Sequence, residues 1–200
     1  MNKRLNFIGG VFLIWGFAAI IDNVSNVETG IAPLMWMSYI CLIVMSIGIL
    51  KRDSGLIASQ VVLIAIPYIL WNIDLIQHLI TGNGLFGITD YIFVKGQITE
   101  KAIALQHVFN IPLSVYSIYL IGLKKSGFWK ISIFQITLVF IITRLTTNYE
   151  QNVNCVFRNC ANFSFGLPYI LEWFLAYIAM ILITTWFLNK SFKNKEEKIK

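Results

Sequence analysis

The chain has 200 residues, of which 57% are hydrophobic and only 13% are charged, and its mean hydropathy is +0.70. A soluble domain has about 25% charged residues and cannot cover so many apolar side chains with polar surface. The net charge of +6 comes from short basic clusters between apolar runs rather than from a continuous basic face, which argues against nucleic-acid binding. The composition therefore predicts an integral membrane protein that contacts membrane lipids.

Six apolar runs are long enough, or nearly so, to cross about 30 Å of hydrocarbon as α-helices. In chain order the runs are 5–21, 31–50, 56–75, 102–123, 128–143 and 167–188. The first run also resembles the apolar region of a signal peptide, but it continues to Ile21 without a clear cleavage site, which favours a retained span. We therefore predict an all-α fold, with residues 1–200 forming a single transmembrane helical bundle.

Basic residues predict the orientation of these runs, because loops rich in Lys and Arg stay on the cytoplasmic side of a membrane. With a cytoplasmic N-terminus, 12 of the 16 Lys and Arg residues fall in cytoplasmic segments, including a basic tail at 189–200. The other four are Lys95, Lys101, Arg144 and Arg158, in the external segments 22–30, 76–101 and 144–166. We expect both termini to be cytoplasmic, and the usage of Ile, Asn and Lys favours a bacterial plasma membrane.

Acidic residues and histidines are distributed asymmetrically between the two sides. Seven of the 10 acidic residues and both histidines lie in external loops or in the outer halves of the predicted helices. Two helix faces carry polar groups at spacings of three and four residues: Pro67, Trp71, Asp74 and His78 on one, and His107, Asn110, Ser114 and Ser117 on the other. The helical rise brings polar groups of five helices to one layer near the outer boundary: Asp22, Asp74, His107, Arg144 and Glu172. Pro67 permits a bend beneath this layer.

A carboxylate and an imidazole one helical turn apart can chelate a metal ion. We expect Asp74, His78 and His107 to be catalytic residues and ligands of one divalent metal ion such as zinc, with Glu172 as a further catalytic residue. The substrate-binding candidates are Trp71, Asn110, Arg144 and Glu150. Water bound to such a metal ionises near neutral pH and can attack an ester, amide or phosphoester. The same residues also fit a metal-free site or structural pairing between helices.

Two external segments carry further signals. Cys155 and Cys160 have four residues between them, which favours a disulfide in an oxidising compartment over two free thiols or a metal site. The long connection 80–100 joins glycines to apolar side chains that water does not accommodate. It predicts either a mobile cover over the polar site or an interfacial segment packed on the bundle.

Three functions fit these features. The first is a membrane-embedded hydrolase or transferase with an outward-facing pocket, acting on a lipid or another apolar-tailed substrate. The second is a non-catalytic membrane subunit or assembly factor whose polar layer is packing or a docking surface. The third is a small-solute transporter or channel, which is disfavoured because the inner halves of the helices offer only uncharged polar groups. The sequence favours the first function and leaves its substrate and oligomeric state open.

Overall fold

The computed structural model describes residues 2–25, 32–93, 98–124, 127–160 and 166–197, and within these ranges it contains helices and no strand. Five helical stretches there are long and apolar enough to cross a membrane. They are α1 (Lys3–Ser25), α3 (Ser54–Thr81), α5 with α6 (Ile98–Ala104 and Gln106–Ile121), α7 (Phe128–Thr146) and α8 (Tyr169–Glu197). The predicted external segment 22–30 and the basic tail lie partly outside the described ranges.

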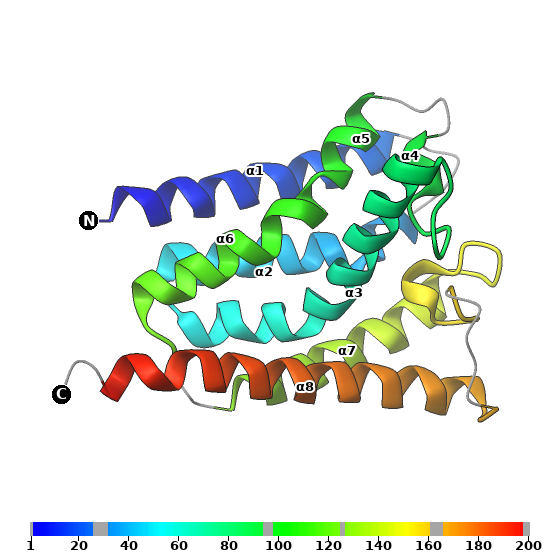
Figure 1. Cartoon of the computed structure of the whole chain (residues 1–200). Helices are drawn as coiled ribbons and strands as arrows, with labels where there is room; N and C mark the ends of the chain where they lie inside the picture. Colours follow the sequence, from blue (N-terminus) through cyan, green and yellow to red (C-terminus); the bar gives the residue numbers. More distant parts are fainter. Residues whose placement is uncertain (1, 26–31, 94–97, 125–126, 161–165, 198–200) are drawn as a thin grey trace.

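Helix α3 lies at the centre of the bundle, where it contacts α6, α7, α8 and α2 (Met37–Lys51). Its N-cap is Asp53, whose carboxylate accepts hydrogen bonds from the backbone N–H groups of Gly55 and Leu56. Figure 1 shows that α3 is bent along its length. Pro67 lies within α3 and has no N–H to donate to the Leu63 carbonyl, which accounts for a bend at this point.

The second predicted span is shorter than expected. Instead of one helix over 31–50, a 3-10 turn, η2 (Ala32–Met35), precedes α2, which starts at Met37. Asn154 from the distant η3 segment (Val153–Cys155) accepts a hydrogen bond from Met37 N at 2.8 Å and donates one to Met35 O at 2.7 Å. This amide caps the helix from outside its own sequence. The remaining 15 residues of α2 extend about 22 Å at the rise of an α-helix.

Helices α1 and α2 pack closely because glycine lies at their contact. A Cβ added at Gly9 would lie 2.8 Å from Leu50 Cγ, so a side chain at this position would separate the helices. Ser46 Oγ donates to the buried carbonyl of Gly9 at 2.7 Å. Such small residues and hydroxyl contacts are typical of helix pairs in membranes, where burial of apolar surface does not drive association.

Polar side chains in the half of the bundle near the termini bond to neighbouring helices. Gln60 on α3 and Gln135 on α7 exchange two amide hydrogen bonds, at 2.8 and 2.9 Å. Ser132 on α7 donates to Ser59 O on α3 at 2.7 Å. These contacts join α3 to α7 and satisfy groups that lipid would leave without partners.

Both termini lie at the same end of the bundle, whereas α4 (Asp90–Phe93), α5 and the η3 segment lie at the other end (Figure 1). The end with the termini also holds the α2–α3 and α6–α7 connections, which carry basic residues. There Arg4 Nη1 donates to the Tyr116 hydroxyl at 3.0 Å, and Arg52 Nη1 donates to Ile49 O at 2.6 Å. The basic clusters and the acidic, histidine-bearing segments therefore occupy opposite ends of the molecule.

Candidate ligand pocket

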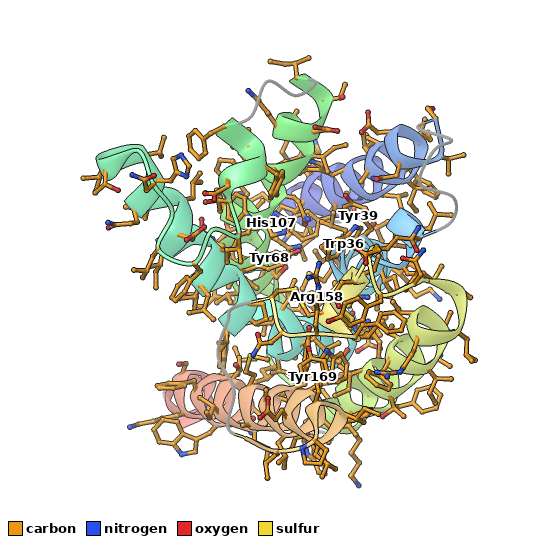
Figure 2. The ribbon with its side chains drawn as sticks, turned by 90° about the vertical axis from the view of Figure 1, so that its right-hand side faces the viewer. Trp36, Tyr39, Tyr68, His107, Arg158 and Tyr169 are labelled. Carbon is orange, nitrogen blue, oxygen red and sulfur yellow. A yellow bond between two sulfur atoms is a disulfide. The ribbon has the colours of Figure 1, made fainter. Side chains whose placement is uncertain are left out.

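A pocket of about 910 Å³ lies at the end of the bundle away from the termini, among residues of α1, α2, α3, α5, α6, α8 and the segments around α4 and η3. Its volume is within the range of pockets that hold small-molecule ligands. Figure 2 looks onto this end and shows Trp36, Tyr39, Tyr68, His107 and Arg158 around one central region, with Tyr169 nearer to α8. The helix ends and the η3 segment together form a cavity that no single element contains.

Aromatic side chains form much of the wall, and His107 lies among them. Tyr68 and Trp71 are three residues apart on α3 and therefore share a face. The His107 ring stacks on Trp71 with a centroid distance of 4.5 Å, and the Tyr68 ring lies at 4.4 Å in a tilted arrangement. The Tyr68 hydroxyl donates to Gln106 Oε1 at 2.9 Å. These contacts fix the imidazole against α3.

The hydrogen bonds of His107 define its protonation pattern. Its Nδ1 lies 2.9 Å from the Ala104 carbonyl oxygen, which can only accept a hydrogen bond, so Nδ1 carries the proton and donates. The neutral ring consequently presents Nε2 as an acceptor. Asn72 Nδ2 donates to His107 O at 2.9 Å and ties the helix backbone to α3. His107 is thus a positioned imidazole in the pocket wall.

Charged groups come from three different elements. Asp22 near the end of α1, Glu100 on α5 and Arg158 after η3 all line the pocket. The Tyr91 phenol is desolvated although its ring is about half exposed, and this desolvation raises its pKa to about 12. A hydrogen bond with the Trp71 side chain lowers the Tyr91 pKa, whereas the Glu100 carboxylate raises it, because it disfavours a second negative charge nearby. Glu100 and the aromatic wall are therefore electrostatically coupled.

An internal network fixes residues 152–160, which contain η3 and Arg158 and are called the η3 segment from here on. Cys155 and Cys160 are joined at an S–S distance of 2.07 Å, which confirms the predicted pairing, and both line the pocket. Asn152 Oδ1 accepts from the backbone N–H groups of Phe157 and Arg158, each at 3.1 Å, while its Nδ2 donates to Arg158 O at 3.0 Å. The Asn-rich composition of this segment thus builds a defined wall.

Asp74, predicted as a catalytic residue and metal ligand, is fully buried and serves another purpose. Its carboxylate accepts hydrogen bonds from Phe86 N, Gly87 N, Thr89 N and Thr89 Oγ1. A Cβ added at Gly84 would lie 2.9 Å from both carboxylate oxygens, so the close approach requires glycine there. Asp74 therefore anchors the segment after α3 onto the helix. That segment contributes Gly87, Ile88 and Tyr91 to the pocket wall.

His78 also contacts this returning segment. Its Nδ1 lies 3.1 Å from Asp90 Oδ1, and its ring stacks on Phe93 at a centroid distance of 3.7 Å. Among the described residues, no group of three or more His, Cys, Asp or Glu side chains is placed to hold a metal ion. The structure therefore does not bring Asp74, His78 and His107 together as three ligands of one metal ion. The first two side chains engage the segment after α3, whereas His107 faces the pocket.

The remaining predicted residues mainly hold elements in place. Glu172 is buried, and its Oε1 accepts from Leu167 N at 3.0 Å just before α8 begins. Arg144 donates to Val156 O at 2.7 Å, with its guanidinium over the rings of Phe140 and Phe157. These contacts fasten the start of α8 and the η3 segment.

Two further substrate-binding candidates also lie outside the pocket lining. Asn110 is buried, and its Oδ1 accepts from Ser114 Oγ at 3.3 Å on the same helix. Glu150 is exposed to solvent on the η3 side of the bundle. Of the eight predicted catalytic and substrate-binding residues, Trp71 and His107 line the pocket.

Several pocket residues escaped the prediction from the sequence. These are Tyr39, Tyr68, Glu100, Arg158 and Tyr177, whereas Asp22 was placed in the outer polar layer by its depth but not among the site residues. Asp22 and Glu100 belong to the acidic group on the side away from the basic clusters, but no helical spacing linked them to His107. Tyr68 lies directly after Pro67 and could have been found by extending the Pro67–Trp71 stripe by one residue. No protein-family model, curated protein or solved structure matches the chain, so the pocket is interpreted from its geometry.

Proposed function

We propose that the chain is an integral membrane protein that binds a small amphiphilic molecule in this pocket. The observation that carries the proposal is the composition of the wall. Apolar side chains such as Leu63, Ile64 and Ile103 share one cavity of about 910 Å³ with charged groups from α1, α5 and the η3 segment. Ligand pockets commonly combine a mostly apolar wall with a few polar groups that orient the ligand.

The proposed orientation places the pocket on the outer side of a bacterial plasma membrane, with both termini in the cytoplasm. The basic residues at the end of the bundle that holds the termini support this orientation through the positive-inside rule. An amphiphile from the outer leaflet would then reach the pocket at the level of the lipid headgroups.

A blind pocket is favoured over a transport path by the contacts at the other end of the bundle. Polar side chains there are paired between helices, as in the reciprocal Gln60–Gln135 contact and the Ser132–Ser59 contact. A conduction path needs polar groups that face a continuous aqueous route. A binding protein needs a polar site at one depth only.

Binding can be tested by filling the cavity. Ser38 lines the pocket and is partly exposed, so a Ser38→Trp variant should fill part of the cavity while the protein still folds. The matched control is Ile131→Trp, because Ile131 lies on the exposed face of α7 outside the pocket lining. The full chain would be mixed with decyl-chain amphiphiles in maltoside micelles. Native mass spectrometry would then count the amphiphile molecules bound to each protein. We expect Ser38→Trp to lose them and Ile131→Trp to keep them; equal binding by both variants would contradict the proposal.

A second candidate function is a metal-free hydrolase or transferase that acts on the bound amphiphile. It is supported by His107, whose donated Nδ1 proton leaves Nε2 as a possible general base in the wall of the pocket. A positioned general base typically contributes about 10²–10⁴-fold to a rate. Lipid vesicles incubated with the wild type and His107→Gln, and analysed by mass spectrometry, would reveal a product formed by the wild type alone. Product formation at equal rates would remove His107 from any mechanism.

A further inference from the structure

We propose that the pocket recognises an ammonium group, so that its ligand is an amphiphile with a cationic or zwitterionic head. This inference rests on the proposed binding function and narrows the chemical class of the ligand. Two sources share this chemistry: the headgroup of an aminophospholipid and a free alkylammonium compound.

Aromatic rings approach the pocket from three elements. Trp36 and Tyr39 come from the start of α2, Trp71 comes from α3, and Tyr91 comes from α4. The face of an aromatic ring attracts a cation within about 6 Å of its centroid, and several rings around one cavity form the usual recognition site for quaternary ammonium groups. In Figure 2, Trp36 and Tyr39 border the same region as Tyr68 and His107.

Two carboxylates line the same pocket next to these rings. Asn23, the neighbour of Asp22, donates from Nδ2 to the Tyr39 hydroxyl at 3.2 Å and so ties the end of α1 to the aromatic wall. The Glu100 carboxylate acts electrostatically on Tyr91. An ammonium group among these rings would therefore meet negative charge from both α1 and α5.

The charge of the lining differs in sign from that of the chain. The protein carries a net charge of +6, yet the described pocket lining contains two carboxylates and, as its single Lys or Arg, Arg158. The Arg158 guanidinium lies 5.3 Å from the Tyr149 ring centroid, which gives it an aromatic partner outside the lining. His107 adds no formal charge in the neutral form defined by its hydrogen bonds. The local balance favours a cation, and Arg158 can meet the phosphate of a zwitterionic head.

The test compares three compounds with the same tail: decyltrimethylammonium, decanol and decanoate. Their binding to the full chain in maltoside micelles would be measured by native mass spectrometry, with thermal unfolding as a check on folding. We expect decyltrimethylammonium to bind about tenfold more tightly than the other two, since both cation–π and ion-pair contacts favour it. Comparable binding of all three would overturn the ammonium inference and leave the binding function intact. Binding of none would overturn both.

Variants of the acidic groups provide the second arm. Asp22→Asn combined with Glu100→Gln should weaken decyltrimethylammonium binding about tenfold, whereas decanol should be unaffected. The control is Glu150→Gln, because Glu150 is an exposed carboxylate outside the pocket lining. If the double variant unfolds, decyltrimethylammonium binding is measured with Glu100→Gln alone, which should fold because Glu100 is exposed. Unchanged binding in a folded acidic variant would overturn the inference.

A pair of substitutions at Trp36 separates cation–π attraction from simple apolar contact. Trp36 is 37% exposed, so the bundle should tolerate its replacement. Trp36→Phe should keep most of the ammonium affinity, while Trp36→Leu should lose about fivefold. Equal losses in the two variants would contradict an aromatic role. Nanodiscs with and without phosphatidylethanolamine distinguish the two sources of the ammonium group. Weaker decyltrimethylammonium binding in nanodiscs that contain this lipid would assign the site to a lipid headgroup, whereas equal binding in both would assign it to a free amphiphile.

Discussion

Two polar regions at the same end of the bundle differ in how their hydrogen-bonding capacity is used. Around Asp74, a carboxylate on α3 is saturated by four donors from the segment that follows the helix. In the pocket, charged and aromatic groups from seven helices and the η3 segment surround a cavity of about 910 Å³. The first region holds the chain together, and the second has room for another molecule.

This difference explains why helical spacing selected Asp74 and His78, which lie outside the pocket lining. Asp74 and His78 lie one turn apart, as metal ligands often do, and they are indeed on one helix face. Both side chains are bonded to the segment after α3, Asp74 to Thr89 and His78 to Asp90. Burying a carboxylate without hydrogen-bond partners costs free energy. A buried carboxylate in a membrane protein can therefore hold a loop in place through its hydrogen bonds, without a role in catalysis.

The largest effect on stability is expected for Asp74→Ala. The substitution leaves the N–H groups of residues 86, 87 and 89 and the Thr89 hydroxyl without their acceptor, which should cost about 3–5 kcal/mol. Denaturant unfolding in micelles measures this loss. Asp90→Ala is the control, since Asp90 is 57% exposed and should cost less than about 1 kcal/mol. An Asp74→Ala protein as stable as the wild type would show that the Asp74 contacts do not hold the chain together.

The next largest effect is expected for Asn154, which joins the pocket wall to the start of α2. Asn154→Ala removes two hydrogen bonds to Met35 and Met37 and places alanine at a φ of 52°, for a combined cost of about 3 kcal/mol. Asn154→Gly removes the same bonds but accepts this backbone conformation, so it should be about 1 kcal/mol more stable than the alanine variant. Equal stability of both variants, measured by unfolding, would show that the backbone conformation carries no cost.

Asn154 also marks the limit of prediction from the sequence. Apolar run length and the asymmetry of basic residues were sufficient to predict a bundle of apolar helices, because both are properties of continuous segments. The late start of α2, at Met37, depends on a contact with a residue 117 positions away along the chain. No local pattern contains such a contact, and the run from 31 to 50 therefore looked like one helix.

The candidate site was predictable in its location but only partly in its residues. The gathering of acidic residues and histidines away from the basic clusters indicated the end of the bundle at which the pocket lies. Periodicity then identified Trp71 and His107, which lie on regular helices. Asp22, Glu100 and Arg158 come from helix ends and an irregular segment, where periodicity carries no information. Their meeting depends on tertiary packing.

Loss of the disulfide should have a moderate effect that bears on the pocket more than on the Asp74 region. Cys155→Ser with Cys160→Ser opens a short loop, which corresponds to about 2 kcal/mol in the chain-entropy account. Because both cysteines line the pocket, amphiphile binding should weaken as well. Alkylation with and without reductant would verify the bond in the wild type. Unaltered binding in the double variant would indicate that the asparagine network alone shapes this wall.

The smallest effect on stability is expected for Glu100→Gln, which tests directly whether a pocket carboxylate stabilises the fold as Asp74 does. Glu100 is an exposed carboxylate on α5, so neutralising it should change the free energy of unfolding by less than about 0.5 kcal/mol. Asp74→Asn provides the contrast, because it retains one acceptor oxygen but introduces an NH₂ group among donors and should destabilise the protein clearly. Unfolding measurements on the two variants compare the same chemical change, a carboxylate replaced by an amide. A similar loss at both positions would mean that the pocket acid is structural too, whereas a loss confined to Asp74 leaves the charge of Glu100 available for a ligand.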